Sequence, residues 1–253
     1  MYELIALFGA GLIAGLVNSV AGGGALIMYP LLFSLGLPPV MTNATIAASI
    51  WPGALSSAYG YRKSLKKLPK YYFLLLIPCI FGSIIGASIL RRTPDRNFEL
   101  VVPWLVLMAV ILLSLQPAIH NKLKKKQKKS KRNSPLSLVL ISIAIFGVAI
   151  YGGYFGAGFG IIMLALLGFT RLTDIHQMNG LKNLAGVSIS LVATIYFIHY
   201  RLIDWHYIPP MVIGTVIGGY VGSTYSHKLP TYLIRKIIII SGLAIAVYLF
   251  IKY

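Results

Sequence analysis

The sequence is poor in acidic residues and in cysteine. Five Asp and Glu residues stand against 23 Lys and Arg in 253 residues, and there is one cysteine, Cys79. A single thiol excludes an internal disulfide and a metal site built on cysteines. The chain also lacks HExxH and GxSxG motifs and paired carboxylates, the patterns on which hydrolytic enzymes depend. We therefore expect no enzymatic activity, no resident cofactor and no metal site.

What the chain has instead is apolar sequence. Hydrophobic residues make up 57% and charged residues 11%, which is too apolar for a soluble domain of this length. The net charge of +18 could suggest a nucleic-acid partner, but the basic residues lie between apolar spans rather than along one amphipathic face. Cations beside membrane spans are the ordinary source of such an imbalance. The composition predicts an all-α polytopic membrane protein that binds no nucleic acid.

A glycine-broken apolar segment occurs twice, at residues 8–37 and 146–169. Further residues match at one constant distance along the chain, which we call the repeat spacing. They predict two homologous halves, a first membrane repeat over 1–119 and a second over 135–253. Two repeats that each begin with a broken helix are typical of a transporter. The matching pairs are Gly24 and Gly160, Asn43 and Asn179, Gly82 and Gly218, and Gly86 and Gly222.

A helix needs about 20 apolar residues to cross a membrane. The opening segments, 3–37 and 135–169, are too long for one straight crossing, so each is either a long broken helix or a helix followed by a re-entrant hairpin. Counting each as one span gives eight transmembrane helices and parallel halves; counting each as two gives inverted halves. The sequence leaves both open. The remaining spans are expected at 42–61, 71–91, 98–118, 174–199, 206–227 and 231–251.

The halves are joined by a basic segment, residues 120–134, with eight Lys and Arg and no acid. It is expected to be a solvated linker that can also attract anionic lipid headgroups. Under either span count, most of the loop cations fall on the side of this linker and of residues 62–70. The positive-inside rule then places both on the cytoplasmic side of the membrane. The N-terminus has no basic region and no clear cleavage site, so it is expected to be a retained first span.

The glycine clusters are candidates for a binding site. A helix interrupted at membrane depth must face protein or a water-filled cavity, because lipid does not satisfy backbone amides. The free N–H groups and the positive end of the following helix can bind an anion without a charged side chain. The alternative is close helix packing through small residues. Two equivalent clusters favour the site, which would include Gly22, Gly23 and Gly24 in the first half and Gly158 and Gly160 in the second.

Polar residues follow each cluster. Asn43 and Asn179 are carboxamides inside expected spans, and Lys182 and Asn183 share a helical face with Asn179 at spacings of three and four residues. An intramembrane cation is a candidate functional residue, although Lys182 could also extend to the nearer interface. Thr173 or Asp174, before this face, is expected to cap the helix, with proton coupling through Asp174 and His176 as the alternative.

Three runs in this order resemble the TauE/SafE-type sulfite exporter family of bacterial permeases. They are AGGGALIMYPLLFSLGLPP, MNGLKNLAGVSISLVATIYFI and IDWHYIPPMVIGTVIGGYVGSTYSHKL, and the resemblance covers nearly the whole chain. The basic linker and the second cluster, where Phe159 interrupts the glycines, depart from the pattern. The resemblance implies export of small sulfur-containing anions, such as sulfite or organosulfonates, across a bacterial inner membrane.

The leading hypothesis is therefore a secondary transporter for a small anion, with its site between the halves. One alternative is a permease for another small solute, although scarce intramembrane acids argue against a metal cation. Another is a membrane enzyme or assembly protein that transports nothing. Substrate, coupling ion and oligomeric state stay open at this point.

Overall fold

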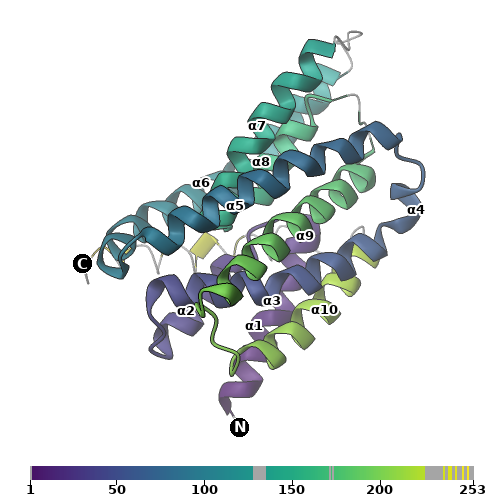
Figure 1. Cartoon of the computed structure of the whole chain (residues 1–253). Helices are drawn as coiled ribbons and strands as arrows, with labels where there is room; N and C mark the ends of the chain where they lie inside the picture. The colour runs from purple at the N-terminus through teal and green to yellow at the C-terminus, as the bar shows by residue number, and fades with distance from the viewer. Residues whose placement is uncertain are drawn as a thin grey trace.

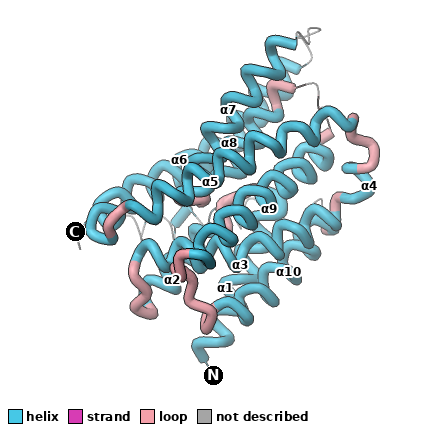
Figure 2. Tube along the Cα trace, in the orientation of Figure 1, coloured by secondary structure: helices cyan, strands magenta, loops and turns pink. Residues whose placement is uncertain are grey.

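The computed structural model describes residues 2–127, 135–170, 172, 174–225 and, after 235, the positions 236, 239, 240, 243, 247 and 250; at 116–127 and 135–138 it describes the backbone alone. The described part is helical, without strands, and its helices are joined by short loops (Figure 2). This confirms the all-α polytopic architecture. The elements are α1 (Tyr2–Val20), α2 (Ala25–Ser34), α3 (Pro39–Gly60), α4 (Arg62–Leu65), η1 (Lys70–Leu75), α5 (Leu76–Arg92), α6 (Asp95–Gln127), α7 (Pro135–Tyr154), α8 (Phe159–Leu167), α9 (Ile175–His199) and α10 (Ile208–Thr224).

Both opening segments are broken where the glycines predict. α1 ends at Val20 and α7 at Tyr154, and the short linkers that follow contain glycines with positive φ: Gly22 (77°), Gly23 (106°), Gly156 (80°) and Gly158 (80°). Residues with a Cβ rarely adopt that conformation, so glycine permits the turn. α2 and α8, with 10 and 9 residues, span about 15 Å each at 1.5 Å per residue. Each is therefore too short to cross a ~30 Å hydrocarbon core.

The short helices fold back on the helices before them. A Cβ built on Gly24 would meet the backbone of Ala14, which lies more than one helix turn before the end of α1. The far end of α8, at Leu167, belongs to the same apolar cluster as Ile141 and Ile145 near the start of α7. The opening segments are thus re-entrant hairpins rather than single tilted helices.

Equivalent helices of the two halves run in opposite directions. α1, α3 and α10 are parallel, since Gly11 and Gly15 of α1 meet Met211 and Thr215 of α10 in the same order. α5, α7 and α9 are parallel in the opposite sense. The end of α3 at Tyr61 lies against the start of α9 at Gly180. Of the two arrangements that the sequence leaves open, the structure has the inverted one. The division of the chain at residues 120–134 itself stays a prediction.

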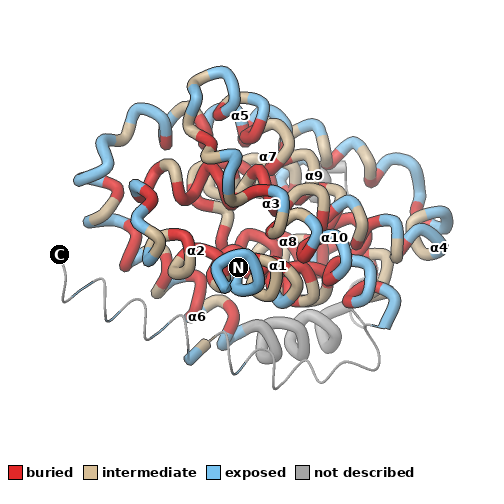
Figure 3. Tube along the Cα trace, turned by 90° about the horizontal axis from the view of Figure 1, so that it is seen from below, coloured by how far each residue is buried: buried red, intermediate tan, exposed pale blue. Residues whose placement is uncertain are grey.

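The helices form two bundles, each built from both halves. The first bundle consists of α1, α2, α3 and α10, and the second of α5, α6, α7, α8 and α9. Within the second bundle, α9 is the helix that packs against α3 of the first (Figure 1). Within the bundles, glycines bring backbones together: Gly218 of α10 meets Leu12 of α1, and Gly82 of α5 meets Phe146 of α7. This confirms a packing role for the two Gly-xxx-Gly pairs. Buried residues follow the inner sides of the helices and exposed ones the outside (Figure 3).

Two carboxylates cap equivalent helix starts. Asp174 accepts a hydrogen bond from the amide of His176 at the start of α9 (2.8 Å), which confirms the expected N-cap. At the start of α3, the amide of Val40 donates to Asp95, at the start of α6 (3.2 Å). Val40 and His176 are separated by the repeat spacing. One half thus caps this helix locally, and the other uses a residue from a neighbouring helix.

Most expected spans are found, with one clear difference. α6 continues as a helix to Gln127, so the basic segment begins inside a helix instead of following a span that ends at 118. Residues 128–134 and most of the last expected span, 231–251, lie outside the described residues. Among the described helices, four are long and apolar enough to cross a membrane: Tyr2–Val20, Lys70–Arg92, Asp95–Leu115 and Ile175–His199.

Candidate functional site

The two glycine breaks meet at the centre of the molecule. A Cβ built on Gly22 would lie 2.9 Å from the Cα of Gly160, and one built on Gly160 would lie 3.1 Å from the Cα of Gly22. The same position on Gly160 is 3.3 Å from the Cδ of Lys182 on α9. Glycine is thus required here for contact between the halves as well as for the turn. The two re-entrant hairpins and α9 converge on this point.

Lys182 lies against the broken end of α1. Its ammonium donates hydrogen bonds to the carbonyl oxygens of Asn18 (2.6 Å) and Ser19 (3.1 Å), and the side-chain amide of Asn183 donates to Ser19 as well (3.1 Å). Lys182 is 1% exposed. The last carbonyls of a helix have no partner within it and carry the negative end of its dipole. A cation and an amide donor from the other half supply those partners.

Asn43 makes the equivalent contact in the other direction. Its side-chain amide donates to the carbonyl oxygen of Tyr154, the last residue of α7 (2.9 Å). Tyr154 follows Asn18 by the repeat spacing, which also separates Asn179 from Asn43. Each half therefore places a polar side chain on the broken helix of the other half. The second half uses Lys182 for this contact, and the first half uses Asn43.

A small cavity lies between these contacts. Its volume is about 20 Å³, which is room for about one water molecule. Asn43, Asn18 and Ser190 give it polar groups, and Phe155 and Phe159 give it aromatic walls. A four-atom oxyanion such as sulfite does not fit this volume.

Free amide groups surround the same region. Within the described chain, the backbone N–H groups of Gly23 and Gly24, before α2, and of Ala157 and Gly158, before α8, donate no hydrogen bond to a protein acceptor. They precede the positive ends of two short helices. The glycine clusters were expected to leave such amides free, and their binding of an anion stays a prediction.

The site is also rich in unpaired acceptors and free of acidic side chains. The side-chain oxygens of Asn179 and Asn183 are buried and have no hydrogen-bond partner in the described part of the chain. None of the five acids is buried, so the ammonium of Lys182 has no buried carboxylate beside it. No group of three or more His, Cys, Asp or Glu residues that could hold a metal occurs among the described residues.

The nine residues that the sequence predicted for the site lie in three different places in the structure. Gly23 and Asn43 line the cavity. Gly22 and Gly160 form the contact between the breaks, and Lys182 and Asn183 hold the end of α1 behind the cavity wall. The remaining three, Gly24, Gly158 and Asn179, are in the adjoining backbone or on the buried face of α9.

Sequence reasoning missed Asn18 and Ser190, which both line the cavity. Asn18 could have been found, because it is a carboxamide in an apolar run, shortly before Gly22. Ser190 carries no comparable signal: a serine in a membrane helix commonly bonds to its own backbone. Only the packing of α9 against the break places it at the cavity.

Comparisons with known proteins match this architecture to one family. The model of the family described as "Sulfite exporter TauE/SafE" matches residues 7–249. The chain belongs to the TauE/SafE family. This match spans both halves and both breaks, which confirms the family resemblance seen in the sequence, and it identifies the chain as a member of a family of membrane transporters.

TauE/SafE relatives cover almost the full chain. A "Probable membrane transporter protein" from Haemophilus influenzae is 29% identical over 94% of this chain and 90% of its own length. "Probable membrane transporter protein ORF9" from Sinorhizobium sp. is 24% identical over 97% and 92%, respectively. "Probable membrane transporter protein YfcA" from Escherichia coli K12 is 24% identical over 92% and 84%. No solved structure matches the chain.

Proposed function

We propose that this protein is a secondary transporter that exports small sulfur-containing anions, such as sulfite or organosulfonates, from the bacterial cytoplasm. The observation that carries the proposal is the meeting of two re-entrant helix starts, with free amides at Gly23, Gly24, Ala157 and Gly158, beside a cavity that Asn43 lines. Amide donors and positive helix ends favour an anion. Acidic side chains, which would repel it, are not buried.

The direction of transport is supported by elementary energetics. A membrane potential that is negative inside drives a monovalent anion outward by ~2.3 kcal/mol per 100 mV. Export of such an anion therefore needs no coupling ion. Residues 62–70 and the basic linker would face the cytoplasm, which places the N-terminus, at the opposite end of the bundles, outside.

Alternating access would come from rotation of one bundle against the other, as in other transporters with inverted repeats. The polar contacts at the centre join the two bundles: Lys182 and Asn183 of one bundle bond to the end of α1 in the other, and Asn43 bonds to the end of α7. Opening the cavity to either side would separate these pairs. The anion would then replace Tyr154 as the partner of the Asn43 amide, and the ammonium of Lys182 would become available to it.

The experiment is a flux assay with purified protein in liposomes, offered sulfite, sulfoacetate, taurine and sulfate in parallel. Flux of at least one sulfur anion that the membrane potential accelerates is the expected result. Absence of flux for all four, from protein that is folded by circular dichroism, would contradict the anion proposal. Lys182→Met separates the alternative of a neutral solute, whose transport should not depend on that charge.

A further inference from the structure

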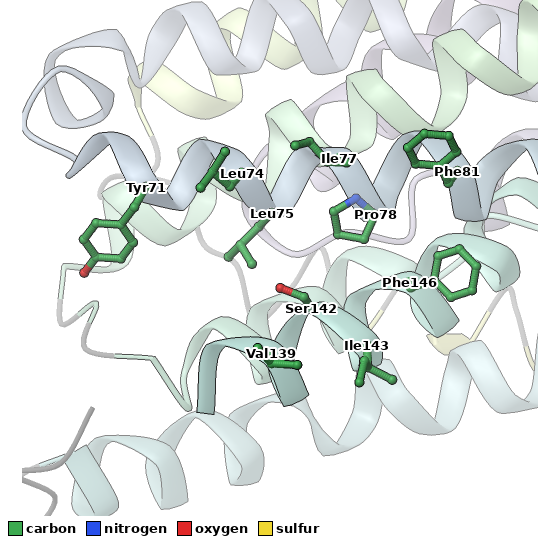
Figure 4. A pocket seen from close by; sticks show the side chains of 10 residues that line it. All are labelled: Tyr71, Leu74, Leu75, Ile77, Pro78, Phe81, Val139, Ser142, Ile143 and Phe146. Atoms are coloured by element: carbon green, nitrogen blue, oxygen red, sulfur yellow. The ribbon is translucent and has the colours of Figure 1, made fainter. Parts of the chain in front are cut away.

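A second cavity lies on the outer surface and shares no lining residue with the cavity at the glycine breaks. It is a groove of about 620 Å³ between the η1–α5 segment and α7 (Figure 4). Its walls are almost entirely apolar and include Leu74, Phe81, Ile143 and Phe146, with Tyr71 at one end. The volume is within the range of pockets that hold small ligands. Leu74, Phe81 and Ile143 are exposed, so the groove opens to the side where a membrane helix meets lipid.

The groove exists because α5 and α7 separate toward their first turns. Their later turns are in contact, where Cβ atoms built on Gly82, Gly86 and Gly153 would meet the partner helix. Pro78 precedes this contact on α5 and lines the groove. Its ring stands where close packing of the two helices would need a small side chain. The two helices therefore leave a wedge that is widest near Tyr71.

The equivalent helix pair in the other half has no such wedge at this position. Gly214 of α10 follows Pro78 by the repeat spacing, and a Cβ built on it would meet the backbone of Phe8 and Leu12 of α1. There the helices are in contact where α5 and α7 are apart. The groove is thus a feature of one face of the molecule and not a consequence of the repeat.

Positive charge lies at the wide end. Lys70 begins η1 and directly precedes Tyr71, and Lys66 and Lys67 precede it in the same connection; all three lysines lie outside the buried core. Each Lys near an anionic membrane surface contributes about 1 kcal/mol of attraction. The groove therefore combines an apolar lining, which would lie at the level of the lipid acyl chains, with cations at the end that would meet the headgroup layer.

We propose that this groove binds an anionic phospholipid, with one acyl chain between α5 and α7 and the phosphate beside Lys66, Lys67 and Lys70. The acyl chain fills space that the helices cannot close, and the Tyr71 hydroxyl lies at the level of the headgroup. Lipid at this position would support the side of the second bundle that contains α5 and α7. The site is separate from the anion pathway and does not depend on it.

The test is native mass spectrometry of the full chain from mixed micelles with equal phosphatidylglycerol and phosphatidylcholine. We expect the wild type to retain phosphatidylglycerol at least about fivefold over phosphatidylcholine, because the three lysines attract the anionic headgroup. Ile143→Trp, which fills the groove, should remove one retained lipid. Ile80→Trp is the matched control, since Ile80 is exposed on α5 and lies outside the groove lining.

Two further variants separate the parts of the site. Lys66→Gln, Lys67→Gln and Lys70→Gln together should keep the lipid and abolish the preference for phosphatidylglycerol. Val139→Phe fills the groove at a second point, in case Ile143→Trp does not fold. Equal lipid retention by the wild type and a folded groove-filling variant would overturn the proposal. So would equal retention of the two lipids by the wild type.

Discussion

The ammonium of Lys182, in the second half of the chain, lies 2.6 Å from the carbonyl oxygen of Asn18, near the end of α1 in the first half. This bond joins the two bundles at the level of both glycine breaks. Its counterpart is the bond from Asn43 to Tyr154. Polar contacts between the halves therefore join the two bundles at this level. In the proposed mechanism, the same side chains exchange these contacts for a transported anion.

Replacing Lys182 with Met should destabilise the contact between the bundles. The carbonyls of Asn18 and Ser19 would lose a charged donor, and hydrogen bonds to charged groups contribute about 1.5–3 kcal/mol each. We expect a lower midpoint of thermal unfolding in detergent together with a weaker affinity for sulfite in the flux assay. Lys63→Met, at an exposed lysine outside the lipid groove, is the control. A lower midpoint with unchanged sulfite affinity would limit Lys182 to supporting the end of α1.

Adding a methyl group at the contact between the breaks should be costly. Gly22→Ala requires a left-handed conformation that costs about 1–2 kcal/mol for a residue with a Cβ, and the new atom would lie 2.9 Å from the Cα of Gly160. We expect reduced stability and loss of transport. Gly147→Ala is the matched control, because a Cβ there has nothing within 4 Å. Equal behaviour of the two variants would disprove the close approach of the hairpins.

Removing the carboxylate of Asp95 should weaken the start of α3. Its bond to the amide of Val40 acts as a helix cap, and loss of a cap costs about 0.5–2 kcal/mol. Asp95→Ala should lower the unfolding midpoint by more than Glu99→Ala, one turn later on α6. Hydrogen exchange at the first turn of α3 should rise in the first variant alone. If both variants exchange equally, Asp95 does not cap this helix.

The inverted arrangement gives a testable topology. In a Cys79→Ser background, we expect a cysteine at Lys66 to react with a membrane-impermeant maleimide only when the reagent enters the cytoplasm. A cysteine at Leu4 should react from outside, because α1 and α3 run in the same direction and Lys66 follows the end of α3. Labelling of both positions from the same side of intact cells would contradict inverted halves.

The sequence revealed the breaks and the partners of the broken helices but not their geometry. Glycines at the repeat spacing located both interruptions, and helical periodicity placed Lys182 and Asn183 on one face, where both contact Ser19. The choice between parallel and inverted halves depends on whether the chain turns back after Gly24. The glycines permit that turn, but its direction brings Gly24 against Ala14, a tertiary contact with no local signal.

The position of Lys182 shows a second limit. An intramembrane cation is expected to face a substrate, whereas in this conformation it satisfies the carbonyl end of α1. Periodicity gives the face of a helix but not which neighbour occupies that face. Ser190 and Phe155 reach the cavity for the same reason, through the packing of α9 and the turn after α7.

The central claim is that a small sulfur anion crosses at the contact between the bundles, where Asn43 lines the cavity. The most direct measurement is the current across a supported membrane when sulfite is added rapidly to the wild type and to Asn43→Leu. We expect a transient current of the sign of a moving anion in the wild type, and none in a folded Asn43→Leu protein. A wild type without current, or an Asn43→Leu variant with the same current, would contradict the account.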